Sequence, residues 1–357
     1  MKFGHFCLPT YFPDVDGSVG EFTRRFVDFL VDSEELGFDA LWANEHHFDP
    51  YGGIIPSPPI MLAALAQRTK RVRLGTSIIV LPLHQPIEIA EQLAMIDLMS
   101  DGRVDLGVGR GFVVADYEAL GIPREGSQER LMDGLEVILK AWSGSSFSHH
   151  GKYYNFDNIE VWPPPQQRPH PPVWLSVGGT PASFKWAGRQ GYKILTVAYR
   201  GVQQLVDLLP LYRDAWLAAG HKVGEWEISS HYQVVLSDNS REARQIAEKA
   251  LRRYVAATTH TIERAEAQAA AEAADRSRVD REVLDIDRMV DECRVIAGTP
   301  NEAVQLLERA RDMMGLTQVD CTFYFGGIPF VQAQRSQRLF AAEVIPMLRS
   351  ETLAAVN

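Results

Sequence analysis

The stretch FDALWA at residues 38–43, followed by PPIMLAALAQRT at residues 58–69 and VRLGTSIIVL at residues 72–81, decides the fold. The first and third segments are short and apolar, as expected for buried strands, whereas the middle segment predicts a helix. A strand, a helix and a second strand in this order imply parallel strands joined by a right-handed crossover.

The same alternation extends over the rest of the chain. We predict strands at residues 3–8, 38–43, 72–81, 104–109, 173–177, 192–197, 226–236 and 319–325. We predict helices at residues 19–36, 58–69, 87–99, 128–142, 181–190, 202–219, 300–314 and 333–348. Eight strands and as many helices match an α/β fold, the (β/α)8 TIM barrel with insertions. An open doubly wound sheet is the alternative, but its only glycine-rich candidate, residues 107–111, lacks the third glycine and follows the fourth strand.

Two segments interrupt the alternation. Residues 143–172 hold a tyrosine pair and a proline-rich run, and we predict a hairpin and surface insertion there, with a domain linker as the alternative. Residues 240–291 are charged and rich in alanine, which favours a solvated helix that is partly mobile. Because strands and helices alternate again after the first segment, we predict that residues 1–357 form a single barrel domain.

The composition argues against several classes of protein. The formal net charge of −10 disfavours a broad nucleic-acid surface and electrostatic docking on anionic membranes. No run reaches the roughly 18 apolar residues of a membrane span, and the first residues lack the pattern of a signal peptide. The three cysteines, Cys7, Cys293 and Cys321, have no metal-ligand spacing. We therefore predict buried thiols in a cytoplasmic protein.

In a barrel of parallel strands, the residues that follow the strands converge at one end and form the site. The second strand ends in Glu45-His46-His47, where zinc is the first hypothesis to consider. Adjacent residues of a strand point to opposite faces, so His46 and His47 would not readily share a metal, and no metal site is predicted. A role in acid/base chemistry at the barrel mouth is favoured, since histidine titrates near neutrality. The alternative is a pair of histidines that only pack and hydrogen-bond.

The fifth strand ends in Val177-Gly178-Gly179-Thr180-Pro181, which predicts a helix start with Thr180 as its cap. Backbone N–H groups at the paired glycines and the positive end of the helix form an anion site, to which Ser183 can add a hydroxyl. A tight turn without a ligand is the alternative. Arg110 follows the neighbouring fourth strand and could supply a cation to the same phosphate.

The third predicted strand is apolar, with small residues at its middle. Such a wall could lie against a flat aromatic ring. Ordinary barrel core is the favoured interpretation from composition alone.

In this order and spacing, the motifs resemble the bacterial luciferase α-chain and the wider luciferase-like flavin monooxygenases. The likeness runs almost from end to end. It is carried by Met1-Lys2-Phe3-Gly4, Gly37-Phe38-Asp39, Glu45-His46-His47-Phe48, Leu74-Gly75-Thr76 with Val80-Leu81-Pro82, Met99-Ser100-Asp101-Gly102-Arg103, Arg110-Gly111, Gly298-Thr299-Pro300, and Leu339-Phe340 with Val344-Ile345-Pro346. Single motifs of this kind are weak, but their combination is specific.

The resemblance implies a barrel that binds reduced FMN, supplied by a separate NAD(P)H:flavin reductase, and that uses O2 to oxygenate an organic substrate. His46 matches the family's catalytic histidine. Arg110, Gly179, Thr180 and Ser183 match positions that hold the flavin phosphate, and the Ser77–Ile78 bond matches a cis peptide beneath the flavin. The resemblance also implies a homodimer, and an active-site lid at residues 256–291.

Three positions depart from the luciferases: Gly109 replaces a reactive cysteine, Gln85 a second histidine and Val113 an aromatic residue. These departures argue against light emission and a long-chain aldehyde, and they favour another small, largely apolar substrate. Two alternatives stay open. One is a deazaflavin-dependent oxidoreductase that transfers hydride, since that group shares the barrel. The other is a non-catalytic flavin-binding partner subunit, against which His46 and Arg110 argue.

Overall fold

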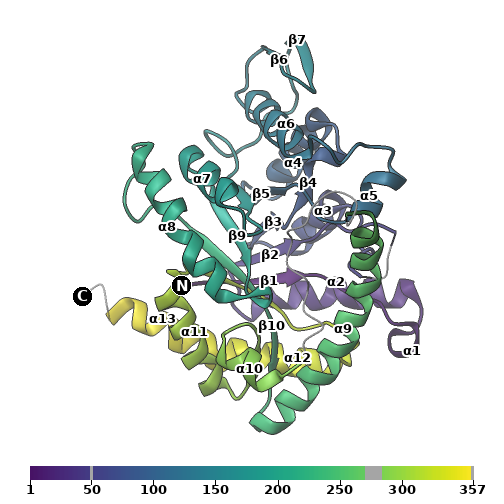
Figure 1. Ribbon diagram of the computed structural model, residues 1–357, viewed down its shortest axis with the longest axis vertical. Helices are drawn as coiled ribbons and strands as arrows, with labels where there is room; N and C mark the ends of the chain where they lie inside the picture. The colour runs from purple at the N-terminus through teal and green to yellow at the C-terminus, as the bar shows by residue number, and fades with distance from the viewer. Residues whose placement is uncertain (49–50, 270–283, 355–357) are drawn as a thin grey trace.

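Eight parallel strands form a closed barrel at the centre of the structure (Figure 1). They are β1 (Lys2–Cys7), β2 (Ala40–Ala43), β3 (Arg73–Thr76), β5 (Val104–Gly109), β8 (Val173–Ser176), β9 (Lys193–Val197), β10 (Ile228–Leu236) and β12 (Gln318–Thr322). β10 pairs with β9 on one side and with β12 on the other, which closes the sheet. The computed structural model describes residues 1–48, 51–269 and 284–354. It confirms the predicted (β/α)8 TIM barrel rather than an open doubly wound sheet.

Helices surround the barrel (Figure 1). The longer ones are α2 (Val19–Glu35), α3 (Pro58–Arg68), α4 (Pro86–Met99), α6 (Ser127–Ala141), α7 (Pro181–Gln190), α8 (Val202–Ala218), α9 (Ser240–Ala269), α11 (Pro300–Met314), α12 (Phe330–Leu339) and α13 (Ile345–Ala354). Short helices lie in the connections: α1 (Pro13–Asp16), η1 (Leu81–Leu83), α5 (Val114–Ala119), η2 (Ala198–Arg200), α10 (Ile286–Asp291) and the π-helical turn η3 (Phe340–Val344). No helix among these residues is long and apolar enough to cross a membrane.

Local sequence explains where the main helices begin and which face they bury. In α2 the Ser18 hydroxyl accepts from the Glu21 N–H while the Glu21 carboxylate accepts from Ser18, a capping box that satisfies two amide donors. Its apolar residues recur at helical spacing and are buried against the barrel, among them Phe22, Phe26 and Phe29. Thr299 and Glu302 form the same capping box at the start of α11.

The structure corrects several predicted boundaries. The strand predicted at 72–81 is two strands, β3 and β4 (Ile79–Val80), separated by a cis peptide bond between Ser77 and Ile78. A short strand that we did not predict, β11 (Ile296–Gly298), adds to β10 outside the barrel. The helix predicted at 333–348 is α12, the π-helical turn and α13. The cis bond itself agrees with what the resemblance implies.

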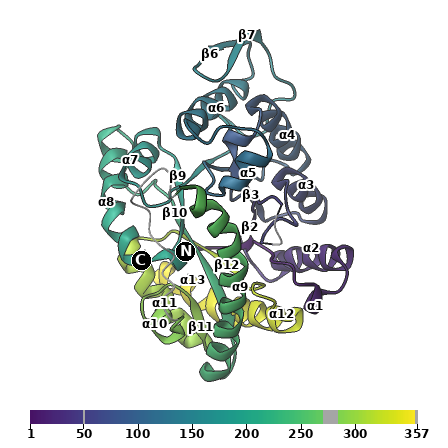
Figure 2. The ribbon, with the colours of Figure 1, turned by 45° about the vertical axis from the view of Figure 1, so that its right-hand side comes forward.

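The predicted insertion at 143–172 contains an antiparallel hairpin of β6 (Phe147–His150) and β7 (Asn155–Ile159). The hairpin projects beyond α6 in both views (Figures 1 and 2). The carboxylate of Asp133 in α6 anchors it, since it accepts from His149 Nε2 at 2.7 Å and from the N–H groups of Tyr153 and Tyr154 at 2.7 and 3.2 Å. That residues 1–357 form one domain stays a prediction.

Two indole rings fill the barrel interior. Trp42 and Trp174 point inward from β2 and β8, are almost fully buried, and meet edge to face with ring centroids 5.3 Å apart. Neighbouring strands supply glycine at the facing positions. A Cβ at Gly75 would lie 2.2 Å from the Trp42 ring, and one at Gly4 would lie 2.8 Å from its Nε1 atom. The indoles therefore fit only because the facing strands carry no side chain there.

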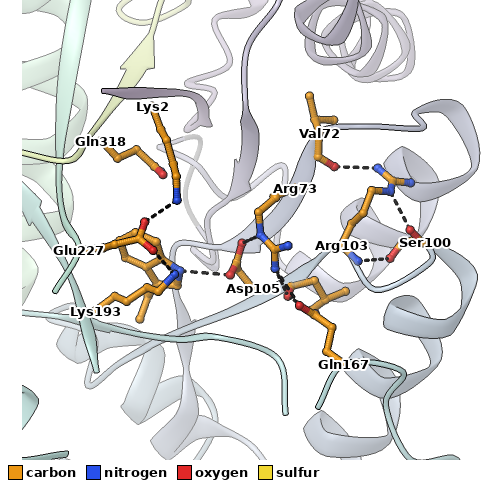
Figure 3. A network of polar contacts seen from close by, with 12 residues as sticks. Lys2, Val72, Arg73, Ser100, Arg103, Asp105, Gln167, Lys193, Glu227 and Gln318 are labelled. Atoms are coloured by element: carbon orange, nitrogen blue, oxygen red, sulfur yellow. Dashed lines mark hydrogen bonds and ion pairs between the residues drawn. The ribbon is translucent and has the colours of Figure 1, made fainter. Parts of the chain in front are cut away.

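The amino-terminal end of the barrel, where the strands begin, is closed by charged side chains (Figure 3). Glu227 lies between Lys2 and Lys193, at 2.8 and 2.5 Å, and Arg73 Nε pairs with Asp105 at 2.5 Å. A cavity of about 200 Å³ lies among these groups. Each of its charged residues already has a partner of opposite charge, so this end is a structural closure.

We expect Gly75→Ala to lower the free energy of unfolding by roughly 1–3 kcal/mol, the usual range for overpacking a core. The added methyl group has no space beside the buried Trp42 ring. Urea unfolding followed by tryptophan fluorescence measures the change. Gly20→Ala in the exposed first turn of α2 is the control and should be neutral or slightly stabilising. Equal losses in the two variants would contradict the packing argument.

Candidate functional site

The carboxyl ends of the barrel strands form the mouth of the barrel, where three strand ends meet closely. A Cβ placed on Gly109 would lie 2.3 Å from Ile78 Cδ1 and 3.2 Å from Ser176 Cβ. Gly109 and Ser176 end the neighbouring strands β5 and β8, and Ile78 follows β3, so the cis bond at Ser77–Ile78 lies in the wall of the mouth. Glycine at 109 leaves this wall flat, which suits a planar ring.

His46 lies in the loop after β2, at the same mouth. Its ring packs on Tyr51, with centroids 4.8 Å apart, and meets the Phe112 ring edge-on at 5.9 Å. A Cβ on Gly52 would lie 2.8 Å from both the His46 ring and the Asn44 amide, so these groups are close neighbours. Two aromatic rings therefore fix the orientation of the predicted acid/base residue.

Tyrosines that the sequence did not single out extend this aromatic wall. The hydroxyls of Tyr51 and Tyr254 lie 2.9 Å apart, which joins the loop after β2 to α9. Tyr199, in η2 after β9, packs edge-on against Tyr254 at 6.1 Å, and burial raises the pKa of Tyr199 to about 12. α9 lies against β10, β11 and α5. The predicted lid at 256–291 falls partly on residues 270–283, which lie outside the described residues, so it stays a prediction.

Glu45 turns away from His46, as strand alternation predicts, and its buried carboxylate accepts three hydrogen bonds. His47 Nε2 and His84 Nε2 lie 2.9 and 2.7 Å from Oε1, and the Val80 N–H donates to Oε2 at 2.9 Å. Burial acts to raise the pKa of the Glu45 carboxyl, but the hydrogen bonds from His47 and His84 outweigh it and lower the pKa to about 2. The hydrogen bond to Glu45 in turn raises the pKa of His47.

The hydrogen bonds around Glu45 argue against the zinc hypothesis for residues 45–47. Both imidazoles direct Nε2 at the same carboxylate oxygen, so Nε2 of each ring carries the proton and cannot also bind a cation. Across the described part of the chain, no group of three or more His, Cys, Asp or Glu side chains is arranged to hold a metal ion.

The amino terminus of α7 has no side-chain cap, as expected of an anion site. Thr180 occupies the cap position but makes no side-chain capping bond; its hydroxyl lies 3.0 Å from that of Ser183. Gly178 is exposed, and an added Cβ there would meet no atom within 4 Å. Backbone amides at the start of this ten-residue helix are thus accessible to a phosphate.

Arg110 directly follows β5, the strand that pairs with β8 ahead of this helix start. Val108 of β5 pairs with Leu175 of β8, so Arg110 and Val177 are the corresponding residues two positions further along each strand. Tyr117 donates a hydrogen bond to the Arg110 carbonyl and fixes the backbone there. The residues predicted to hold a phosphate therefore come from adjacent strand ends of one mouth.

Known proteins resemble this chain over most of its length. Residues 1–317 match the family described as luciferase-like monooxygenase. The alkanal monooxygenase alpha chain of the Kryptophanaron alfredi symbiont is 26% identical over 99% of both chains. The oxygenase component of the flavin-dependent trigonelline monooxygenase of Acinetobacter baylyi is 33% identical over 54% of this chain and 53% of its own length. The F420-dependent glucose-6-phosphate dehydrogenase of Amycolatopsis mediterranei is 29% identical over 92% of this chain and 95% of its own.

Among solved structures, monooxygenase RslO1 from Streptomyces bottropensis superimposes with a TM-score of 0.83 at 32% identity. The match covers 98% of this chain and all of the other. The fold is thus shared with a monooxygenase over almost the full length of the chain.

We expect Glu45→Gln to lower the free energy of unfolding by roughly 1.5–3 kcal/mol, the range for hydrogen bonds to charged groups. His47 has a raised pKa in the folded state, so its pairing is fully stabilising below its ordinary pKa of 6.5 and is lost as the pH rises through the raised value. The pKa of Glu45 falls from 4.5 to about 2, so its contribution is present above pH 4.5 and is lost as the pH falls toward 2.

The difference between wild type and Glu45→Gln should therefore be largest between about pH 4.5 and 6.5. Urea unfolding at a series of pH values measures it. A difference that stays constant on both sides of this window would contradict the assignment of the ionised Glu45–His47 pair.

Proposed function

This chain belongs to the luciferase-like monooxygenase family, and we propose that it is the oxygenase component of a two-component, FMN-dependent system. It receives reduced FMN from a separate NAD(P)H:flavin reductase and uses O2 to oxygenate a small, largely apolar organic substrate. The observation that carries the proposal is the open amino terminus of α7, next to Arg110 and on the same mouth as His46. Full-length relatives named as monooxygenases, and a relative named as an oxygenase component, support it.

In this proposal the α7 amides and the Thr180 and Ser183 hydroxyls bind the FMN phosphate, with Arg110 as the cation and Val177, Gly178 and Gly179 as the backbone around it. The Ser77–Ile78 segment and Gly109 form the floor under the flavin ring. Reduced FMN supplies the electrons that activate O2. The aromatic residues around His46 exclude water from the reacting atoms.

We assign His46 the catalytic role. Its imidazole would exchange a proton with the reacting oxygen, and the packing on Tyr51 and Phe112 holds the ring in one orientation. The substrate would then contact Tyr199, Tyr254 and the aromatic rings near His46. These surroundings suit an apolar molecule.

A second candidate is a deazaflavin-dependent oxidoreductase that transfers hydride, favoured by the full-length similarity to an F420-dependent dehydrogenase. The same phosphate site and the same histidine would serve it. A non-catalytic partner subunit is disfavoured because His46 and Arg110 are both in place at the mouth.

We also propose that the chain forms a homodimer. The outer faces of α3 and α4 expose a set of large apolar side chains, which a second copy of the chain would cover: Ile60, Met95, Leu98 and Met99. The three cysteines are buried free thiols, which supports the prediction of a reducing cytoplasm.

The proposed function is tested by a substrate screen with reduced FMN and O2, read by mass spectrometry for the gain of one oxygen atom. We expect oxygenated product from wild type, and a loss of roughly a hundredfold or more in turnover for His46→Ala, the range for removing a general acid or base. His150→Ala, in the exposed hairpin, is the matched control and should retain turnover. Tight deazaflavin binding with hydride transfer and no oxygenated product would decide for the second candidate.

Arg110→Ala should weaken the binding of reduced FMN by roughly 1.5–3 kcal/mol and leave reduced riboflavin, which has no phosphate, almost unaffected. Anaerobic fluorescence titration measures both affinities. Arg71→Ala, an exposed arginine at the other end of the barrel, should change neither. Equal weakening of both ligands would place the phosphate away from Arg110.

A further inference from the structure

We propose that Glu45 is a positioning residue: its carboxylate fixes the spacing between the segment that carries His46 and the Ser77–Ile78 segment. This inference rests on the proposed function, which gives both segments their roles. It concerns a residue that touches neither substrate nor cofactor and acts only through its neighbours.

The direction of the Glu45 side chain separates it from the reacting groups. Asn44 and His46 both lie beside Gly52, whereas the Glu45 side chain has no exposed surface and meets His84 and the Val80 N–H instead. The carboxylate therefore cannot contact a ligand in the mouth. Its influence passes through the backbone of residue 46.

The donors to Glu45 come from separate segments of the chain. Val80 belongs to β4, two residues after the cis bond, and His84 follows η1. His47 belongs to the loop of His46 itself. One carboxylate thus joins the loop after β2 to the chain just beyond Ile78. Removing one imidazole leaves two hydrogen bonds, but removing the carboxylate releases all three.

The charge of Glu45 makes the restraint rigid. Its pKa is lowered to about 2 by hydrogen bonds that outweigh burial, so the carboxylate is ionised at neutral pH. A buried carboxylate has no water to turn toward, and charge-assisted hydrogen bonds hold it to its donors. His47 is faced by Glu45 and by Asp116 of α5, both of which raise its pKa, so the protonated ring is favoured.

A matched pair of variants tests the inference. Glu45→Gln removes the buried charge beside the loop of His46, and Glu227→Gln removes a carboxylate that also holds two partners, Lys2 and Lys193, at the opposite end of the barrel. Thermal denaturation gives the loss of stability of each. With the substrate found in the screen, Glu45→Gln should lower kcat about tenfold or more, the factor for one charged hydrogen bond. KM should change far less, and Glu227→Gln should leave kcat near wild type.

A double-mutant cycle with His46→Ala separates positioning from general loss of stability. If Glu45 acts through His46, the double variant loses no more turnover than His46→Ala alone. Losses that multiply, or equal losses of kcat in Glu45→Gln and Glu227→Gln at comparable thermal stability, overturn the inference. If Glu45→Gln does not fold, His84→Asn takes its place, with a smaller loss of kcat expected and an unchanged kcat overturning the inference.

NMR of the histidine rings distinguishes failure of the positioning role from failure of the proposed function, because the measurement needs no turnover. The His46 ring resonances, assigned with His46→Ala, should move in Glu45→Gln and stay in place in Glu227→Gln. Unchanged His46 resonances in Glu45→Gln overturn the positioning role. A wild type that oxygenates nothing, with His46 resonances that do move, overturns only the proposed function.

Discussion

The packing of two indole rings inside the barrel is the constraint on which the rest of the structure depends. Trp42 and Trp174 occupy the volume that side chains from eight strands would otherwise share. Glycines at positions 4 and 75 make room for them, and Gly107 allows its strand to approach the Thr76 carbonyl. The indoles and the paired charges occupy the lower part of the barrel, around a cavity of about 200 Å³. The candidate site lies at the other end, where the strands finish.

Because of this packing, the residues that stabilise the barrel and the residues of the candidate site lie at different levels along the barrel axis. The paired charges lie below the indoles. Asp320 lies beside Trp42; burial raises its pKa to about 7, and its carboxylate accepts from Gln318 at 2.8 Å. Above them lie Gly109, Ile78 and the loop of His46. Glu45 belongs to neither group. Its ionised carboxylate is buried and accepts hydrogen bonds from residues at the upper end.

The sequence predicted what depends on local pattern. The alternation of apolar runs and amphipathic segments predicted the barrel, and Thr180-Pro181 predicted the start of α7. It did not predict that His84 and Val80 would meet Glu45, because contacts between residues 35 and 39 positions apart depend on how two strand ends are placed in space. Tyr51 and Tyr254 were missed for the same reason. β11 was missed because three apolar residues before a capping box carry no strand signal of their own.

The hairpin of β6 and β7 is tied to the mouth and not only to α6. The hydroxyl of Tyr154 donates to the carbonyl of His84 at 3.2 Å, and His84 is one of the three donors to Glu45. An insertion that projects from the surface is thus linked through two successive hydrogen bonds to the carboxylate beside His46. For protein engineering, grafting this hairpin between relatives transfers more than a surface loop. A chimaera has to keep Tyr154 together with its acceptor, the carbonyl of His84. Without this hydrogen bond, the recipient barrel loses a contact that holds His84 next to Glu45.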